Sequence, residues 1–189
     1  QWLVDHWINH YDEENTAALC HYFNKNASTD VRLNSWKNSQ DDVALALDEL
    51  EIPWEFSPES KVFIRISKGL SKILKSEWFQ TGMFSIQNRS SGAVVELLDP
   101  QPNETILDVC AAPGTKTNYI VEKQKGEGTV IASDMSMARI KKGKMRSEAL
   151  EYPVEWVCKD ASTDAFPMAD RILIDAPCTG TGVMGRRPD

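Results

Sequence analysis

The sequence lacks several features that would assign it to common protein classes. No apolar run in its 189 residues approaches the length of a membrane span, and no signal-peptide pattern opens it. Its four cysteines form no C-x-x-C pair, which argues against a zinc site and favours a reducing cytoplasm. The net charge of −7 does not indicate general nucleic-acid binding, which would need a local basic patch. We therefore expect a cytoplasmic protein without a metal site or a membrane partner.

One stretch organises the rest of the chain. Ile106 to Val109 is a short apolar run, typical of a buried parallel strand, and residues 117–124 follow at helical spacing. Small residues and a Pro-Gly pair join the two, so that a ligand can approach the main chain. A strand, a tight turn and a helix present backbone N–H groups to a ligand in α/β domains. The turn residues are Cys110, Ala111, Ala112, Pro113, Gly114, Thr115 and Lys116.

Neither common phosphate-binding pattern is present. Val109 stands at the first glycine position of a P-loop, and the dinucleotide pattern G-x-G-x-x-G is absent. The next strand, residues 129–134, ends in Asp134, 20 residues after Gly114, where α/β nucleotide sites place the acceptor for ribose hydroxyls. An adenosine ligand without a pyrophosphate fits, and S-adenosylmethionine is the commonest. The alternative is a tight strand-to-helix turn of any doubly wound domain.

Further candidates follow the next expected elements. The strand at residues 154–157 leads to Asp160, which could accept from an adenine amino group or cap the turn at 162–164. The strand at 171–174 leads to Asp175 and Cys178, and a cysteine placed so is a better candidate for chemistry than a lone buried one. The helix at 135–150 carries a basic stripe that is either a solvated face or a phosphate-contacting surface. Its members are Arg139, Lys141, Lys142, Lys144 and Arg146.

The first half predicts a small mixed domain. We expect helices at 2–8, 13–23 and 41–50, the last opened by a capping box of Ser39 and Asp42, and strands at 30–34 and 61–66. Asn88 to Ser91 form an N-cap cluster before a helix at 92–98, which Asp99 and Pro100 end. The predicted organisation is an α+β subdomain at 1–84 followed by an α/β core at 85–189.

Two ordered motifs carry a family resemblance. The segments DVCAAPGTK at 108–116 and DAPCTGTGV at 175–183, followed by RPD at 187–189, resemble the Sun/nucleolar-antigen family of RNA cytosine-C5 methyltransferases. The bacterial enzymes that act on 16S ribosomal RNA look most similar. Asn88 replaces the usual Asp of the family's lead-in motif, and Thr115 replaces a common Gly while keeping Lys116 in register.

The resemblance implies a Rossmann-like, S-adenosylmethionine-dependent core preceded by a small RNA-contacting subdomain. By that resemblance, residues 110–116 would wrap the methionine end of the cofactor, Asp134 would bind the ribose and Asp160 the adenine. Asp175 would lie between the cofactor and the target cytosine. RNA, ribosomal RNA first, is the implied partner; the oligomeric state is not indicated.

The implied reaction needs a cysteine thiolate, because cytosine C5 attacks a methyl group only after a nucleophile adds to C6. In the family this nucleophile belongs to a later Thr-Cys motif, and Cys178 would assist product release. That motif is not in the sequence, and only four core strands are visible where such sheets have seven, so we expect a truncated core. The alternatives are an inactive fragment that binds S-adenosylmethionine and RNA, a transfer-RNA cytosine-C5 methyltransferase, or Cys178 as the nucleophile. An exocyclic amine acceptor is disfavoured by the Ala-Pro-Cys loop.

Overall fold

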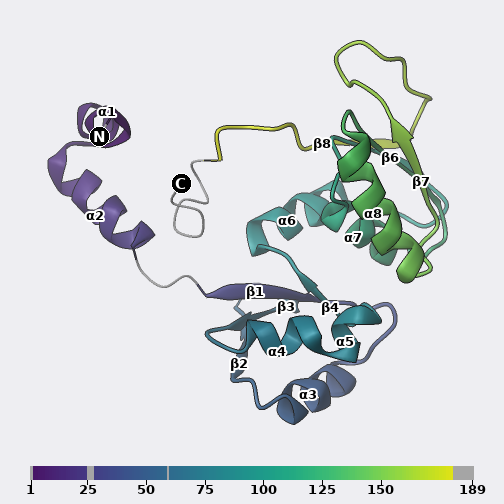
Figure 1. Ribbon diagram of the computed structural model, residues 1–189, viewed down its shortest axis with the longest axis horizontal. Coiled ribbons are helices and arrows are strands. Elements are labelled where there is room, and N and C mark those ends of the chain that lie inside the picture. The colour runs from purple at the N-terminus through teal and green to yellow at the C-terminus, as the bar shows by residue number, and fades with distance from the viewer. Residues whose placement is uncertain (1, 25–27, 59, 181–189) are drawn as a thin grey trace. The chain divides into compact units, whose positions relative to one another are not determined.

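The computed structural model describes residues 2–24, 28–58 and 60–180 (Figure 1). The chain forms two compact units, one from residues 1–28 and 178–189 and one from residues 29–177. In the first unit, α1 (Trp2–Tyr11) and α2 (Glu13–Phe23) confirm the two predicted helices. Trp7 stacks on Phe23 with ring centroids 5.9 Å apart, which joins the two helices.

The second unit begins with an antiparallel sheet. Its strands are β1 (Thr29–Leu33), β2 (Trp54–Ser57), β3 (Ser60–Ile66) and β4 (Phe84–Ile86), in the order β2-β3-β1-β4. The two longer strands were predicted. The two outer ones were not, because three or four residues are too few to establish a period of two. The last strand of this sheet, β4, spans the predicted domain boundary between residues 84 and 85, and the sheet belongs to the same compact unit as the α/β core. The division into domains at 1–84 and 85–189 stays a prediction.

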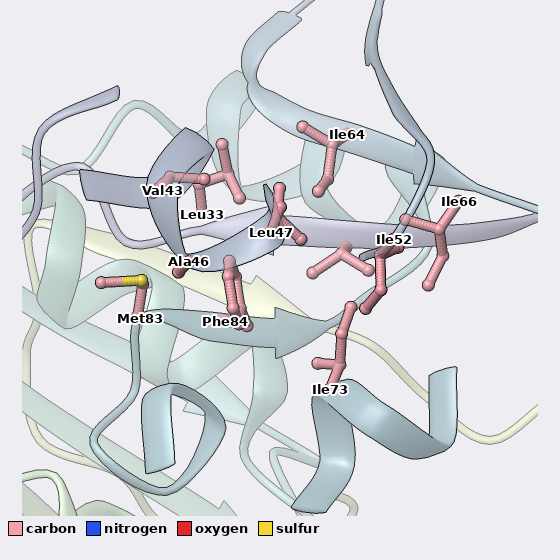
Figure 2. Close-up of a cluster of buried hydrophobic side chains, with 11 residues drawn as sticks. Leu33, Val43, Ala46, Leu47, Ile52, Ile64, Ile66, Ile73, Met83 and Phe84 are labelled. Carbon is pink, nitrogen blue, oxygen red and sulfur yellow. The ribbon is translucent and has the colours of Figure 1, made fainter. Parts of the chain in front are cut away.

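One face of this sheet is apolar and is covered by short helices. These are α3 (Gln40–Glu49), α4 (Leu70–Lys75) and α5 (Glu77–Gln80). The predicted capping box opens α3: Ser39 Oγ accepts from Asp42 N at 3.2 Å, and Asp42 Oδ2 accepts from Ser39 N at 2.9 Å. Figure 2 shows how side chains of the sheet and helices meet. The buried cluster includes Leu33, Val43, Ala46, Leu47, Ile52, Ile64, Ile66, Ile73 and Phe84.

The other face of the sheet packs on the α/β core. Since side chains alternate along a strand, Arg32 and Phe63 point away from the apolar cluster. The Phe63 ring meets Tyr119 edge-on at 6.2 Å. The helix α6 (Arg89–Leu98) also lies here; Asn88 caps it by accepting from Ser90 N at 2.9 Å. The strand β1 is therefore buried on both faces along nearly its whole length.

A parallel sheet forms the core. Its strands are β5 (Thr105–Val109), β6 (Thr129–Asp134), β7 (Val154–Cys158) and β8 (Arg171–Ile174), in the order β7-β6-β5-β8. The helix α7 (Thr115–Lys123) connects β5 to β6, and α8 (Met137–Ala149) connects β6 to β7. The chain adds strands on one side of β5 and then crosses to the other, as in a Rossmann-like fold. This confirms the predicted fold class and all four core strands.

No helix within residues 2–24, 28–58 and 60–180 combines the length and apolar character needed to cross a membrane.

The contact between Gly92 and Phe63 generates a stability prediction. A Cβ at Gly92 would lie 2.1 Å from Phe63 Cζ, and Phe63 is fully buried. We expect Gly92→Ala to lower the free energy of unfolding by about 1–3 kcal/mol through overpacking, although Ala favours a helix. Urea denaturation measures this. Ser91→Ala, one residue earlier, is the control and should change it by less than about 0.5 kcal/mol; a Gly92→Ala variant as stable as the control would contradict the packing.

Candidate functional site

The sequence-predicted acidic residues meet at one edge of the parallel sheet. In the strand register, Val109 pairs with both Ser133 and Ile174, and Asp134 pairs with Cys158. Because all four strands run in the same direction, their carboxyl ends lie at the same edge. The strand order reverses between β5 and β8, and the carboxyl edge beside such a reversal is the usual ligand position in these sheets. It carries the turn at 110–116, Asp134, Asp160 and Asp175.

The turn after β5 is tight and backed by an aromatic ring. Cys110 has φ 62° and Gly114 has φ 96°, and Ala111 N donates to Ser133 O at 2.7 Å. A Cβ at Gly114 would lie 3.0 Å from the Trp156 ring, so the position requires glycine for its conformation and for space. Gly114 caps α7 without a side-chain hydrogen bond. The N-cap residue therefore offers no side-chain acceptor to the first N–H groups of α7. Such N–H groups at the start of a helix are suited to bind an anionic ligand group.

Asp134 holds this turn in place. It is 2% exposed; its Oδ2 accepts from Ala112 N at 3.2 Å, and its Oδ1 accepts from Ser136 N at 2.9 Å. Arg139 Nη1 lies 3.1 Å from Oδ2, and the same guanidinium donates to the Ala112 carbonyl. Asp134 and Arg139 thus bind both backbone groups of Ala112. The sequence predicted Asp134 here but read Arg139 only as part of the basic stripe.

Two further polar contacts connect α7 to the strand ends. Lys116 Nζ lies 2.6 Å from Asp175 Oδ2; the lysine side chain is 16% exposed and the aspartate 54%. Thr117 Oγ1 donates to Asp108 Oδ2 at 2.6 Å. Burial raises the pKa of the Asp108 carboxyl to about 7, against opposing effects of the Thr117 hydrogen bond and the Lys116 charge. Asp108, which the sequence analysis did not single out, therefore adds a titratable group beneath the site.

Asp160 has local partners. Its Oδ1 accepts from Ser162 N at 2.8 Å and from Ser162 Oγ at 2.6 Å, and these bonds lower the pKa of the carboxyl. This is the geometry expected of the turn-capping alternative. An adenine contact by Asp160 stays a prediction.

The cysteines differ in their surroundings. Cys110 is partly buried. Burial raises the pKa of its thiol most, and the charge of Asp134 raises it further. Such a thiol is a poor nucleophile at neutral pH. Cys178 is exposed and belongs to the other compact unit, so its predicted role stays a prediction. Within the described residues, no group of three or more His, Cys, Asp or Glu side chains could hold a metal ion.

The five cations of the predicted basic stripe on α8 differ in their partners. Arg139 binds the turn, as described above, and Arg146 donates to the carbonyls of Gln80 and Phe79 at 3.1 and 2.6 Å. Lys144 pairs with Glu148 on the surface at 3.9 Å. Two of the five cations thus have structural roles, which weakens the phosphate-contacting interpretation.

Comparisons with known proteins agree with this architecture. A family model described as 16S rRNA methyltransferase RsmB/F matches residues 95–189, and one described as an RsmF/B-like ferredoxin-like domain matches residues 1–71. The probable ribosomal RNA small subunit methyltransferase B of Synechocystis sp. (strain ATCC 27184 / PCC 6803 / Kazusa) is 33% identical over 193 residues, covering the whole chain and 43% of that relative. The chain thus spans less than half the length of the curated relatives it matches.

Two solved structures share the fold. The crystal structure of PH0851 superposes with a TM-score of 0.89 at 29% identity, covering 99% of this chain and 43% of that one. A methyltransferase homolog protein from Pyrococcus horikoshii gives a TM-score of 0.81 at 26% identity, covering 96% of this chain and 60% of that one. Both sheets therefore recur together in known proteins.

The buried Asp108 carboxyl predicts a pH dependence of stability. Its pKa is about 7 in the folded protein and near 3.8 when unfolded. Between these values the folded state holds a proton that the unfolded chain has released, so stability falls as pH rises, by at most about 1.4 kcal/mol per pH unit. Asp108→Asn keeps an acceptor for Thr117 and cannot ionise, so its stability should fall less from about pH 5 to about pH 7.

Urea denaturation of both proteins across this pH range measures the difference. Asp170→Asn is the control: Asp170 accepts from Thr105 N at 2.8 Å at the other edge of the sheet. This variant shows what the loss of a hydrogen-bonded carboxylate outside the site does to the same profile. An Asp108→Asn profile parallel to the wild-type one would contradict the assigned pKa.

Proposed function

Because the chain belongs to the RsmB/F family of 16S ribosomal RNA methyltransferases, we propose that it serves S-adenosylmethionine-dependent methylation of cytosine C5 in RNA, with 16S ribosomal RNA as the substrate. The observation that carries this proposal is the meeting of the turn at 110–116, Asp134 and Asp175 at the carboxyl edge of the parallel sheet. Neither a P-loop nor a dinucleotide pattern offers a competing ligand there.

The residues at this edge fit an adenosine ligand with an amino-acid end. The turn offers backbone N–H groups at the start of α7 to the carboxylate of the methionine end, and Lys116 lies beside it. Asp134, at the end of β6, is the acceptor for the ribose hydroxyls, and Asp160 contacts the adenine. S-adenosylmethionine supplies the methyl group when bound. In this assignment, Arg139 must release Asp134 Oδ2 for the ribose to take its place.

Asp175 orients the target base. Its carboxylate extends from the end of β8, is half-exposed, and is held by Lys116 at 2.6 Å. An oriented, accessible carboxylate can accept a hydrogen bond from the cytosine edge and so hold C5 toward the methyl donor. Cys178 follows three residues later and is the cysteine that assists product release. The thiolate that adds to C6 is assigned to the family's Thr-Cys motif.

The reaction predicts a position-specific exchange. Methylation at C5 must release the hydrogen of that carbon, so RNA carrying tritium at cytosine C5 should lose tritium to water in step with methyl transfer. The assay uses the full-length protein, S-adenosylmethionine and 16S ribosomal RNA, with unrelated RNA of equal length as the control. Methyl transfer without tritium release would point to an exocyclic amine and contradict the proposal.

Cofactor binding depends on Asp134 in this assignment. We expect Asp134→Ala to weaken the affinity for S-adenosylmethionine by about 1–3 kcal/mol, because it removes the ribose acceptor and frees Ala112 N. Isothermal titration calorimetry measures the change. Asp170→Ala is the matched control, since Asp170 also accepts from a backbone N–H, at the opposite sheet edge. Equal affinities for the wild type and Asp134→Ala would refute the assignment of Asp134.

A further inference from the structure

A buried ion pair joins the antiparallel sheet to the helix that follows the turn. Arg32 on β1 is fully buried, and its Nη1 contacts Glu122 Oε2 on α7, whose side chain is 4% exposed. Arg32 Nε donates to Gln87 Oε1 at 2.5 Å, and the guanidinium lies 4.2 Å from the centroid of the Tyr119 ring. Burial lowers the pKa of Arg32 to about 10, so it stays charged at neutral pH. This ion pair thus joins β1 of the antiparallel sheet to α7 of the α/β core.

The Glu122 carboxylate has a second tie. Tyr152, between α8 and β7, donates its hydroxyl to Glu122 Oε1 at 3.1 Å. The same hydroxyl accepts from Asn34 Nδ2 at 2.7 Å, and Asn34 follows β1. Both oxygens of Glu122 are therefore held by groups connected to the small sheet. These contacts fix both the rotation of α7 about its own axis and its position along that axis at Glu122.

The other end of the same helix carries the candidate site. Lys116 and Thr117, in the first turn of α7, contact Asp175 and Asp108. Glu122 lies six positions after Lys116, which corresponds to a helical rise of roughly 9 Å. Because a two-turn helix moves as one body, a shift at Glu122 displaces the first turn and the backbone groups of residues 114–116. The pair is thus linked mechanically to the ligand-facing turn.

The energetics favour a positioning role over a stabilising one. Removing two charges from water costs several kcal/mol each, and apolar side chains of similar volume often replace a buried pair without loss of stability. The rings of Phe63 and Tyr119 already pack against each other beside the ion pair, and such packing does not require a charged group. The ion pair and its hydrogen bonds add direction, which apolar contacts do not supply.

We propose that Arg32 and Glu122 are positioning residues that set α7, and through it the turn at 110–116, for S-adenosylmethionine. The inference rests on the proposed function for the identity of the ligand. In this proposal, the small sheet affects the affinity for the cofactor through α7 and not through a contact with the cofactor.

The test compares the wild type with Glu122→Gln and with the double variant Arg32→Met/Glu122→Leu. Glu122→Gln leaves a buried guanidinium without its carboxylate and should lower the unfolding temperature. The double variant removes both charges and should recover most of that loss. In both variants we expect the Kd for S-adenosylmethionine to rise about tenfold. Glu104→Gln is the matched control, because Glu104 pairs with Arg171 at 2.7 Å at the opposite sheet edge.

Titration calorimetry well below the unfolding temperature separates the two roles. Partial unfolding lowers the number of ligands bound per protein, whereas a displaced turn raises Kd at unchanged stoichiometry. A raised Kd in the folded double variant, with Glu104→Gln at the wild-type value, supports the inference. A wild-type Kd in the double variant overturns it, whatever Glu122→Gln does. Absence of binding by the wild type would instead count against the proposed function.

Discussion

The parallel pairing of β5 with both β6 and β8 is the constraint on which the site depends. Because Val109 is in register with Ser133 and Ile174, three strand ends reach the same level. A slip of one residue would turn Asp134 or Asp175 to the opposite face of the sheet. The apolar residues Ile106 and Leu107 hold that register from both faces, so the buried core determines where the polar groups emerge.

Much of the core could be predicted from local pattern. Four short apolar runs identified the four parallel strands, and the residues after them identified Asp134 and Asp175 at one edge, since parallel strands end together. The Ser39 capping box and the Asn88 cap were also readable, because a cap depends on residues two or three positions away. Such features are local, and their physical causes lie within the segment itself.

The rest depends on distant contacts. The alternation of residues 30–34 gives Arg32 a polar, outward position, yet Arg32 is fully buried because α7 covers that face. Arg139 and Arg146 look like solvent-facing members of a helical stripe, but one binds the turn and the other the end of α5. No pattern along the chain distinguishes these cations from exposed ones. Their partners are 27 and 67 residues away, so only the tertiary structure assigns them.

Trp156 gives the turn a built-in optical reporter. Its indole ring lies against both Gly114 and Gly143, and its Nε1 donates to Ser147 Oγ at 3.3 Å, so the ring fits between the turn and α8. Indole fluorescence responds to changes in neighbouring polar groups and in solvent access. A rearrangement of the turn at Gly114 therefore alters the fluorescence emission of Trp156. Replacing the other tryptophans in the chain would isolate this signal.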